Sequence, residues 1–181
     1  MKTLPIILLI FLSCDLFGQI DSRKDWPKSI QNEFDLIKDQ YIDTFLIYYA
    51  YLGPWTNLPD SCKGIPSVWI LWKKDKNYSA QQLFCDSINK DSRQITDKSF
   101  TYFLNHRKDF KLKDEYFKKT KNLPPMQTDG LEEYLIFMTK KENIILNLSD
   151  YQRADNKWNS LEWVKVTIEA INLTKNELKI K

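Results

Sequence analysis

The chain has 181 residues, of which 28% are charged and 14% aromatic, and its formal net charge is +3 at pH 7. This length is enough for one domain with a substantial core. A small net positive charge among many charged residues indicates no particular polyanionic partner. Nucleic acid is also an unusual partner for an exported chain, which the N-terminal segment predicts this one to be.

The N-terminal segment has the pattern of a secretory signal peptide. Lys2 gives it a positive start, and the apolar run Leu4–Leu12 is too short to span a bilayer as a helix. Cleavage after Gly18 would leave Gln19 as the new N-terminus, and the ending Leu-Phe-Gly-Gln resembles bacterial signal peptides. We therefore predict that residues 1–18 are a signal peptide.

Two other outcomes stay open for this segment. Leu12-Ser13-Cys14 resembles a loose lipobox, in which Cys14 would carry a lipid anchor, although Phe11 fits that pattern poorly. An uncleaved anchor is the third option. The first interpretation predicts export to the periplasm or the medium, with residues 19–181 as a single α+β domain. Membrane association is expected only if Cys14 is lipidated.

A helix and a buried strand come first in the mature chain. Asp25 is a candidate N-cap, and the helix that follows places apolar side chains on one face. The run 45–52 is continuously apolar or aromatic, which predicts a central strand covered on both faces, although a buried helical turn fits too. The expected helix face consists of Ile30, Phe34, Ile37 and Tyr41.

A hairpin bracketed by two cysteines follows the loop 53–61. Two β-rich runs flank the polar turn Lys73–Asn77, and Asn77 is expected to take the left-handed conformation. Without Cys14, an exported chain keeps an even number of cysteines, which favours a disulfide. We predict that Cys62 and Cys85 form it.

The C-terminal half alternates helices with a second hairpin. A helix capped by Thr96 or Asp97 is expected to bury Phe100, Phe103 and Leu104, and the segment 107–121 interleaves basic and aromatic residues. The second hairpin pairs 134–138 with 144–148. The last helix is expected to be capped by Ser160 and to bury Leu161, Val164, Ile168 and Ile171.

This order of elements predicts an α+β fold. Two hairpins and one strand give an antiparallel sheet of about five strands, and about three helices would pack against it. No parallel strand–helix–strand pattern with a glycine-rich turn is present, so a dinucleotide-binding fold is disfavoured.

The sequence offers little catalytic or metal chemistry. His106 is the one histidine and lies at an expected helix end, so a surface role is favoured. One histidine and two separated cysteines do not make a zinc site, and we predict neither a metal nor a cofactor. Glu132 and Glu133 are adjacent on a strand, so their side chains are expected to point to opposite faces.

Two functional hypotheses remain. The first is a small exported, non-catalytic protein that binds an unknown protein or small ligand, through the loop residues Trp55, Asn57 and Asp60. The alternative is an exported hydrolase whose site combines scattered carboxylates with the Ser61 loop. A binder should display an exposed aromatic patch, whereas a hydrolase should show a polar pocket that holds acidic residues.

Overall fold

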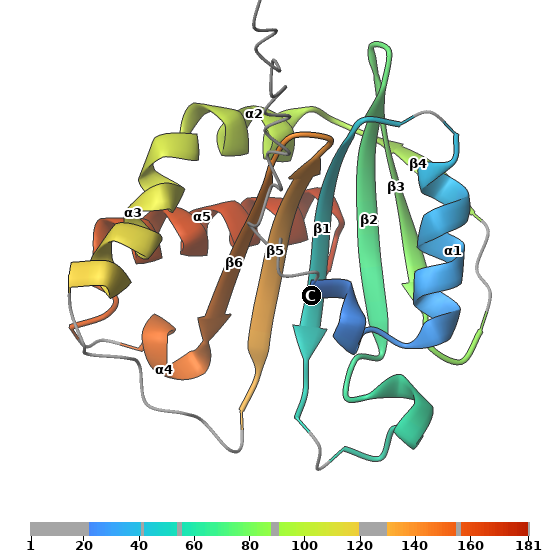
Figure 1. Cartoon of the computed structure of the whole chain (residues 1–181), viewed down its shortest axis with the longest axis horizontal. Helices are drawn as coiled ribbons and strands as arrows, with labels where there is room; N and C mark the ends of the chain where they lie inside the picture. Colours follow the sequence, from blue (N-terminus) through green and yellow to red (C-terminus); the bar gives the residue numbers. More distant parts are fainter. Residues whose placement is uncertain are drawn as a thin grey trace, which may run out of the picture.

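The computed structural model describes residues 22–40, 42–53, 56–87, 91–119, 130–154 and 157–180. These residues form an α+β fold, as predicted, with a six-stranded antiparallel sheet in the order β4-β3-β2-β1-β5-β6 (Figure 1). The strands are β1 (Thr44–Tyr51), β2 (Ser67–Lys74), β3 (Asn77–Phe84), β4 (Ser92–Ile95), β5 (Glu132–Thr139) and β6 (Asn143–Ser149).

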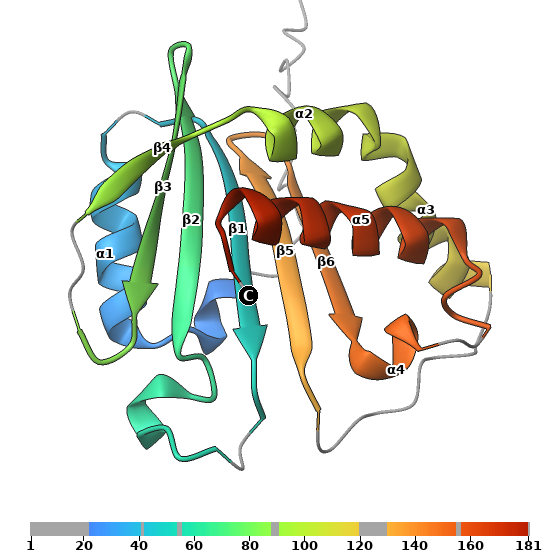
Figure 2. The same cartoon turned by 180° about the vertical axis from the view of Figure 1, so that it is seen from behind.

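Helices lie on both faces of this sheet. Figure 2 shows α5 running across one face together with α2 and α3, whereas α1 lies on the opposite face. The described part of the chain thus has more helices than the three expected. They are α1 (Lys28–Lys38), α2 (Lys98–Asn105), α3 (Arg107–Lys119), α4 (Asp150–Arg153) and α5 (Glu162–Glu177), with short 3-10 helices η1 (Ser22–Asp25) and η2 (Asp60–Cys62).

Strand β1 lies in the middle of the sheet because both of its faces are apolar. It pairs with β2 on one side and β5 on the other. Its even-numbered residues, such as Leu46, pack in the core beneath α2, α3 and α5. Its odd-numbered residues, such as Ile47, pack in a second core with Ile30 and Phe34 of α1. The prediction of a central strand is confirmed.

The predicted disulfide is present. Cys62 ends η2 and Cys85 follows β3, with their Cα atoms 5.2 Å apart and their sulfur atoms bonded. The backbone N–H of Cys85 also donates to the carbonyl oxygen of Pro66 at 3.1 Å. The base of the first hairpin is therefore joined to the turn that precedes it.

Several local predictions were wrong. Ser92–Ile95 forms an edge strand that its polar sequence hid. The left-handed residue of the first hairpin turn is Asp75, with φ 58°, and not Asn77. Leu104 is 52% exposed, because the end of α2 lies at the molecular surface. The N-cap positions of α1 and α5 are Pro27 and Leu161 in place of Asp25 and Ser160.

Candidate ligand-binding groove

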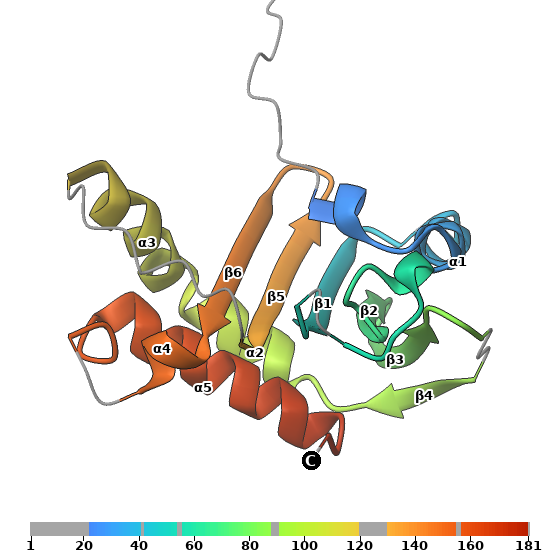
Figure 3. The same cartoon turned by 90° about the horizontal axis from the view of Figure 1, so that it is seen from below.

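One face of β5 and β6 has no α-helix over it among the described residues. Helix α1 packs against β2 and β3 on this side of the sheet, and Figures 1 and 3 show that it leaves β5 and β6 uncovered. Strand alternation places the even-numbered residues of β5 and the odd-numbered residues of β6 on this open face. An open sheet face of this kind can hold a ligand.

A cavity of about 480 Å³ lies on this open face, and we call it the tyrosine groove. Its lining residues come from strands β1, β5 and β6, from the end of η1, and from the turn that follows Cys62. Its lining residues are Asp25, Tyr49, Tyr51, Lys63, Ile65, Tyr134 and Ile145.

The sheet register builds the aromatic floor of the groove. Tyr49 of β1 is opposite Tyr134 of β5, and their rings stack with centroids 4.7 Å apart and planes 3° from parallel. Trp26, which follows η1, packs edge-on against Tyr49 with centroids 5.8 Å apart. Tyr49 is therefore a buried support, whereas Tyr134 is half-buried and faces the cavity.

Both floor tyrosines stay protonated at physiological pH. Burial raises the pKa of Tyr49 to about 12. Burial also raises the pKa of Tyr134 well above its ordinary value, and the hydrogen bond that its hydroxyl donates to Glu132 adds to this shift. That bond is 2.6 Å long and fixes the Tyr134 hydroxyl. The hydroxyl proton points to Glu132, so the oxygen offers its lone pairs to other groups.

Gly64 makes room for the third tyrosine. A Cβ atom there would lie 2.6 Å from Cε2 of Tyr51 and 2.8 Å from the carbonyl oxygen of Gly53, and the φ of Gly64 is +75°. The Gly64 carbonyl accepts a hydrogen bond from the backbone N–H of Leu52 at 2.9 Å. Glycine at this position therefore lets the disulfide turn close against the end of β1, where Tyr51 forms a wall of the groove.

Charged residues stand at the edge of the groove. Asp25 and Lys63 line it, and Glu132 is opposite Tyr51 in the β1–β5 register on the same face. The Nζ atom of Lys63 donates to the backbone carbonyl of Lys24 at 3.3 Å. The negative charges of Asp25 and Glu132 both help to raise the pKa of Tyr49, although burial is the larger cause.

The predicted binding loop borders this groove without lining it. Its two ends lead to Tyr51 and Lys63, which are groove residues. Asn57 and Asp60 are exposed and do not line the cavity, and Trp55 lies outside the described residues. A binding role for Trp55, Asn57 and Asp60 stays a prediction. The three groove tyrosines were not singled out, because on the sequence they belong to strands that resemble core.

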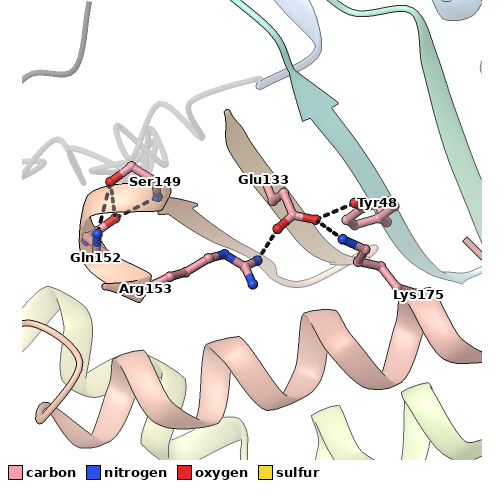
Figure 4. A network of polar contacts seen from close by, with 6 residues as sticks. All are labelled: Tyr48, Glu133, Ser149, Gln152, Arg153 and Lys175. Carbon is pink, nitrogen blue, oxygen red and sulfur yellow. Dashed lines mark hydrogen bonds and ion pairs between the residues drawn. The ribbon is translucent and has the colours of Figure 1, made fainter. Parts of the chain in front are cut away.

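A second tyrosine–carboxylate cluster lies on the opposite face, beneath α5 (Figure 4). The hydroxyl of Tyr48 donates to Glu133 at 2.5 Å, and Nζ of Lys175 is 3.1 Å from the same carboxylate. Arg153 forms an ion pair with its other oxygen. The Glu133 side chain is 3% exposed, so we call this set the buried Glu133 cluster.

The short helix α4 positions the arginine of this cluster. Ser149 and Gln152 form a capping box, in which each side chain bonds to the other residue's backbone N–H (Figure 4). Because the cap fixes the first turn, Arg153 is directed back to Glu133. Three elements are thereby joined through a single carboxylate, which is a structural role. The expectation that Glu132 and Glu133 point to opposite faces is confirmed.

Other chemically suggestive residues do not form a site. His106 pairs with Asp109 at 3.0 Å on the surface, and Ser61 is exposed. Within the described ranges, no three metal-ligating side chains come together.

No helix in the described ranges is long and apolar enough to cross a membrane. The basic face of α3 is partly neutralised, because Arg107 and Lys111 both pair with Glu142.

No protein-family model, no curated protein and no solved structure matches this chain. Inferences about function therefore come from the geometry of the chain itself.

Proposed function

We propose that this is a small exported protein that binds a ligand without transforming it, and that the tyrosine groove is its binding site. The observation that carries the proposal is a preformed aromatic cavity on a sheet face over which no α-helix lies in the described part of the chain. Ligand sites are commonly concave, lined by aromatic side chains and furnished with a few polar groups, which describes this cavity.

Export is supported by the disulfide and by the N-terminal pattern. A bonded cysteine pair persists in an oxidising compartment, such as the periplasm or the medium. The signal peptide at 1–18 accounts for that location, and lipidation at Cys14 remains the alternative route.

The hydrolase alternative has weaker support. Its most buried acid, Glu133, is held by two cations and a tyrosine, and it lines none of the cavities described on the surface. Its candidate nucleophile, Ser61, has no described histidine or lysine bonded to its hydroxyl. We therefore place binding first.

The test compares a groove variant with a matched tyrosine elsewhere. Tyr134→Ala removes the outer ring of the groove, whereas Tyr102→Ala removes a tyrosine on α2 whose hydroxyl donates to Glu169 at 2.8 Å. Both mature variants and the parent protein would be screened by ligand-detected NMR against a fragment library. The proposal predicts a set of binders lost in Tyr134→Ala and retained in Tyr102→Ala. It fails if the folded parent binds no fragment, or if both variants bind equally.

A further inference from the structure

We propose that the ligand of the tyrosine groove is a small organic cation of the ammonium type. This inference depends on the proposed binding function and adds the chemical class of the ligand. Three features carry it: the aromatic surface of the cavity, the two carboxylates in and beside its lining, and the hydrogen-bond acceptors that these provide.

The aromatic surface suits a cation. An ammonium group over a tyrosine face is attracted by the ring quadrupole, by an amount that grows as water is excluded. Tyr51 and Tyr134 both line the cavity and are half-buried, so each ring presents surface to it. Tyr49 stacks behind Tyr134 at 4.7 Å and keeps that ring in place. A fixed ring loses little conformational freedom when a ligand binds.

The described lining is balanced in charge, with Asp25 against Lys63. Glu132 does not line the cavity, but it lies on the same face and holds the Tyr134 hydroxyl, so it adds a negative charge beside the groove. Lys63 is placed at the edge, with Nζ directed to the carbonyl oxygen of Lys24. An anionic ligand would be repelled by Asp25 in the lining and by Glu132 beside it, whereas a cation would gain from both.

The polar groups also favour a ligand that donates hydrogen bonds. Ionised carboxylates are acceptors only, and the Tyr134 hydroxyl already donates its hydrogen bond to Glu132, so only its lone pairs remain for a ligand. The Lys63 ammonium gives one of its three N–H groups to a backbone carbonyl. A primary or secondary ammonium ion would donate to the carboxylates and to the Tyr134 oxygen, and a quaternary one would rely on the rings and the charge.

A larger cavity of about 660 Å³ at the other end of the open face was a competing candidate. Its described lining carries Arg23, Lys38 and Lys140 against Asp39 and Asp43, and Lys140 pairs with Asp43 at 2.6 Å. With more cations than carboxylates and Phe45 as its one described aromatic residue, it suits an organic cation less well than the tyrosine groove.

The experiment measures binding of simple cations to the mature protein by isothermal titration calorimetry and by chemical-shift changes. The probes are tetramethylammonium and choline, and the matched neutral probe is 3,3-dimethylbutan-1-ol, which has the shape of choline without its charge. The inference predicts that the neutral probe binds at least about tenfold more weakly than choline. Phosphatidylcholine vesicles, with phosphatidylglycerol vesicles as control, show whether a lipid headgroup can occupy the groove as well as the free ion.

Two variants that change the charge around the groove in opposite directions sharpen the test. Glu132→Gln keeps an acceptor for the Tyr134 hydroxyl but removes a charge, so choline affinity should fall about threefold to tenfold. Lys63→Asn removes the opposing charge, and asparagine tolerates the left-handed backbone at φ 50°, so affinity should rise a few fold. Higher salt should weaken binding in the parent protein.

The outcomes distinguish a failure of the cation inference from a failure of the proposed binding function. Equal binding of the neutral and charged probes, or unchanged affinity in both variants, overturns the cation inference while the groove stays a binding site. Neutral fragments that bind and are lost in Tyr134→Ala lead to the same conclusion. If neither the cations nor any fragment binds the folded protein, the proposed function itself fails.

Discussion

The two faces of the β1–β5 pairing carry similar tyrosine–carboxylate pairs with different surroundings. On the covered face, Tyr48 donates to Glu133, and Lys175 and Arg153 neutralise that carboxylate beneath α5. On the open face, Tyr134 donates to Glu132 beside a cavity of about 480 Å³. The same chemistry therefore serves packing on one side and is available to a ligand on the other.

This contrast shows that the covering layer determines the role of a residue more than its identity does. Glu132 and Glu133 are consecutive, and the period of two along a strand sends them to opposite faces. Helix α5 lies over Glu133 and supplies a cation to it (Figure 4), whereas no described α-helix lies over the face of β5 that carries Glu132 (Figure 1). Stability should therefore depend on Glu133, and ligand binding should depend on Glu132.

The largest expected effect is the loss of the buried charge. Glu133→Gln leaves Arg153 and Lys175 without their counter-charge, which should lower the free energy of unfolding by about 3 kcal/mol. The loss is smaller than it would be for fully buried cations, because both of these side chains are partly exposed. Glu132→Gln is the matched control, and its cost should stay below about 1 kcal/mol. Urea denaturation monitored by tryptophan fluorescence measures both. Equal costs would mean that the open-face carboxylate is also structural.

Alkaline titration tests the burial of Tyr49. Its folded pKa of about 12 is above the ordinary value of 10, so its stabilising effect is complete below pH 10 and is lost as the pH rises towards 12. The free energy of unfolding should fall by about 2 kcal/mol over this window because of Tyr49. Tyr49→Phe should reduce the slope of stability against pH in that window. An unchanged slope in this variant would show that Tyr49 ionises as freely as in the unfolded chain.

Gly64→Ala tests how the groove wall is built. Alanine is strained at a φ of +75°, and its Cβ would overlap Tyr51, so we expect a loss of about 2 kcal/mol. The displaced ring should also alter the chemical shifts of Tyr51 and weaken probe binding. Gly53→Ala is a suitable control, because its φ of +83° is also unfavourable although no atom lies within 4 Å of the added Cβ. Equal effects of the two substitutions would leave backbone strain as the whole cause.

The smallest effects should come from removing single hydroxyl groups. Tyr48→Phe leaves the buried Glu133 with one partner fewer and should cost about 1.5 kcal/mol. Tyr134→Phe should cost less than about 0.5 kcal/mol, because water can replace the lost bond on the open face. Thermal unfolding of the two variants gives the comparison directly. The reverse order of costs would contradict the assignment of the two faces.

The sequence predicted those features that depend on nearby residues. The first helix, the central strand, both hairpins and the disulfide follow from local periodicity and from cysteine counting, and the structure confirms them. The edge strand Ser92–Ile95 was missed because its side chains are polar and half of its backbone partners are absent at a sheet edge.

The groove could not be predicted in the same way. Tyr49 and Tyr134 meet only through the pairing of β1 with β5, and nothing local sets that register. The run 45–52 is apolar on both faces, so it gives no sign of which face a helix leaves open. The one available signal was that Glu132 and Tyr134 are two residues apart on a strand, so that both lie on the same face next to an apolar strand.

The register of β1 with β5 also has a kinetic consequence. Tyr48 and Glu133 are 85 residues apart, so the centre of the sheet forms only after a long loop closes, whereas both hairpins can form locally. Folding chains should therefore pass through a stage with paired hairpins and an unassembled sheet centre. A ligand that requires Tyr49 and Tyr134 together cannot recognise that stage. Its binding would draw the population towards the fully assembled state and report that assembly is complete.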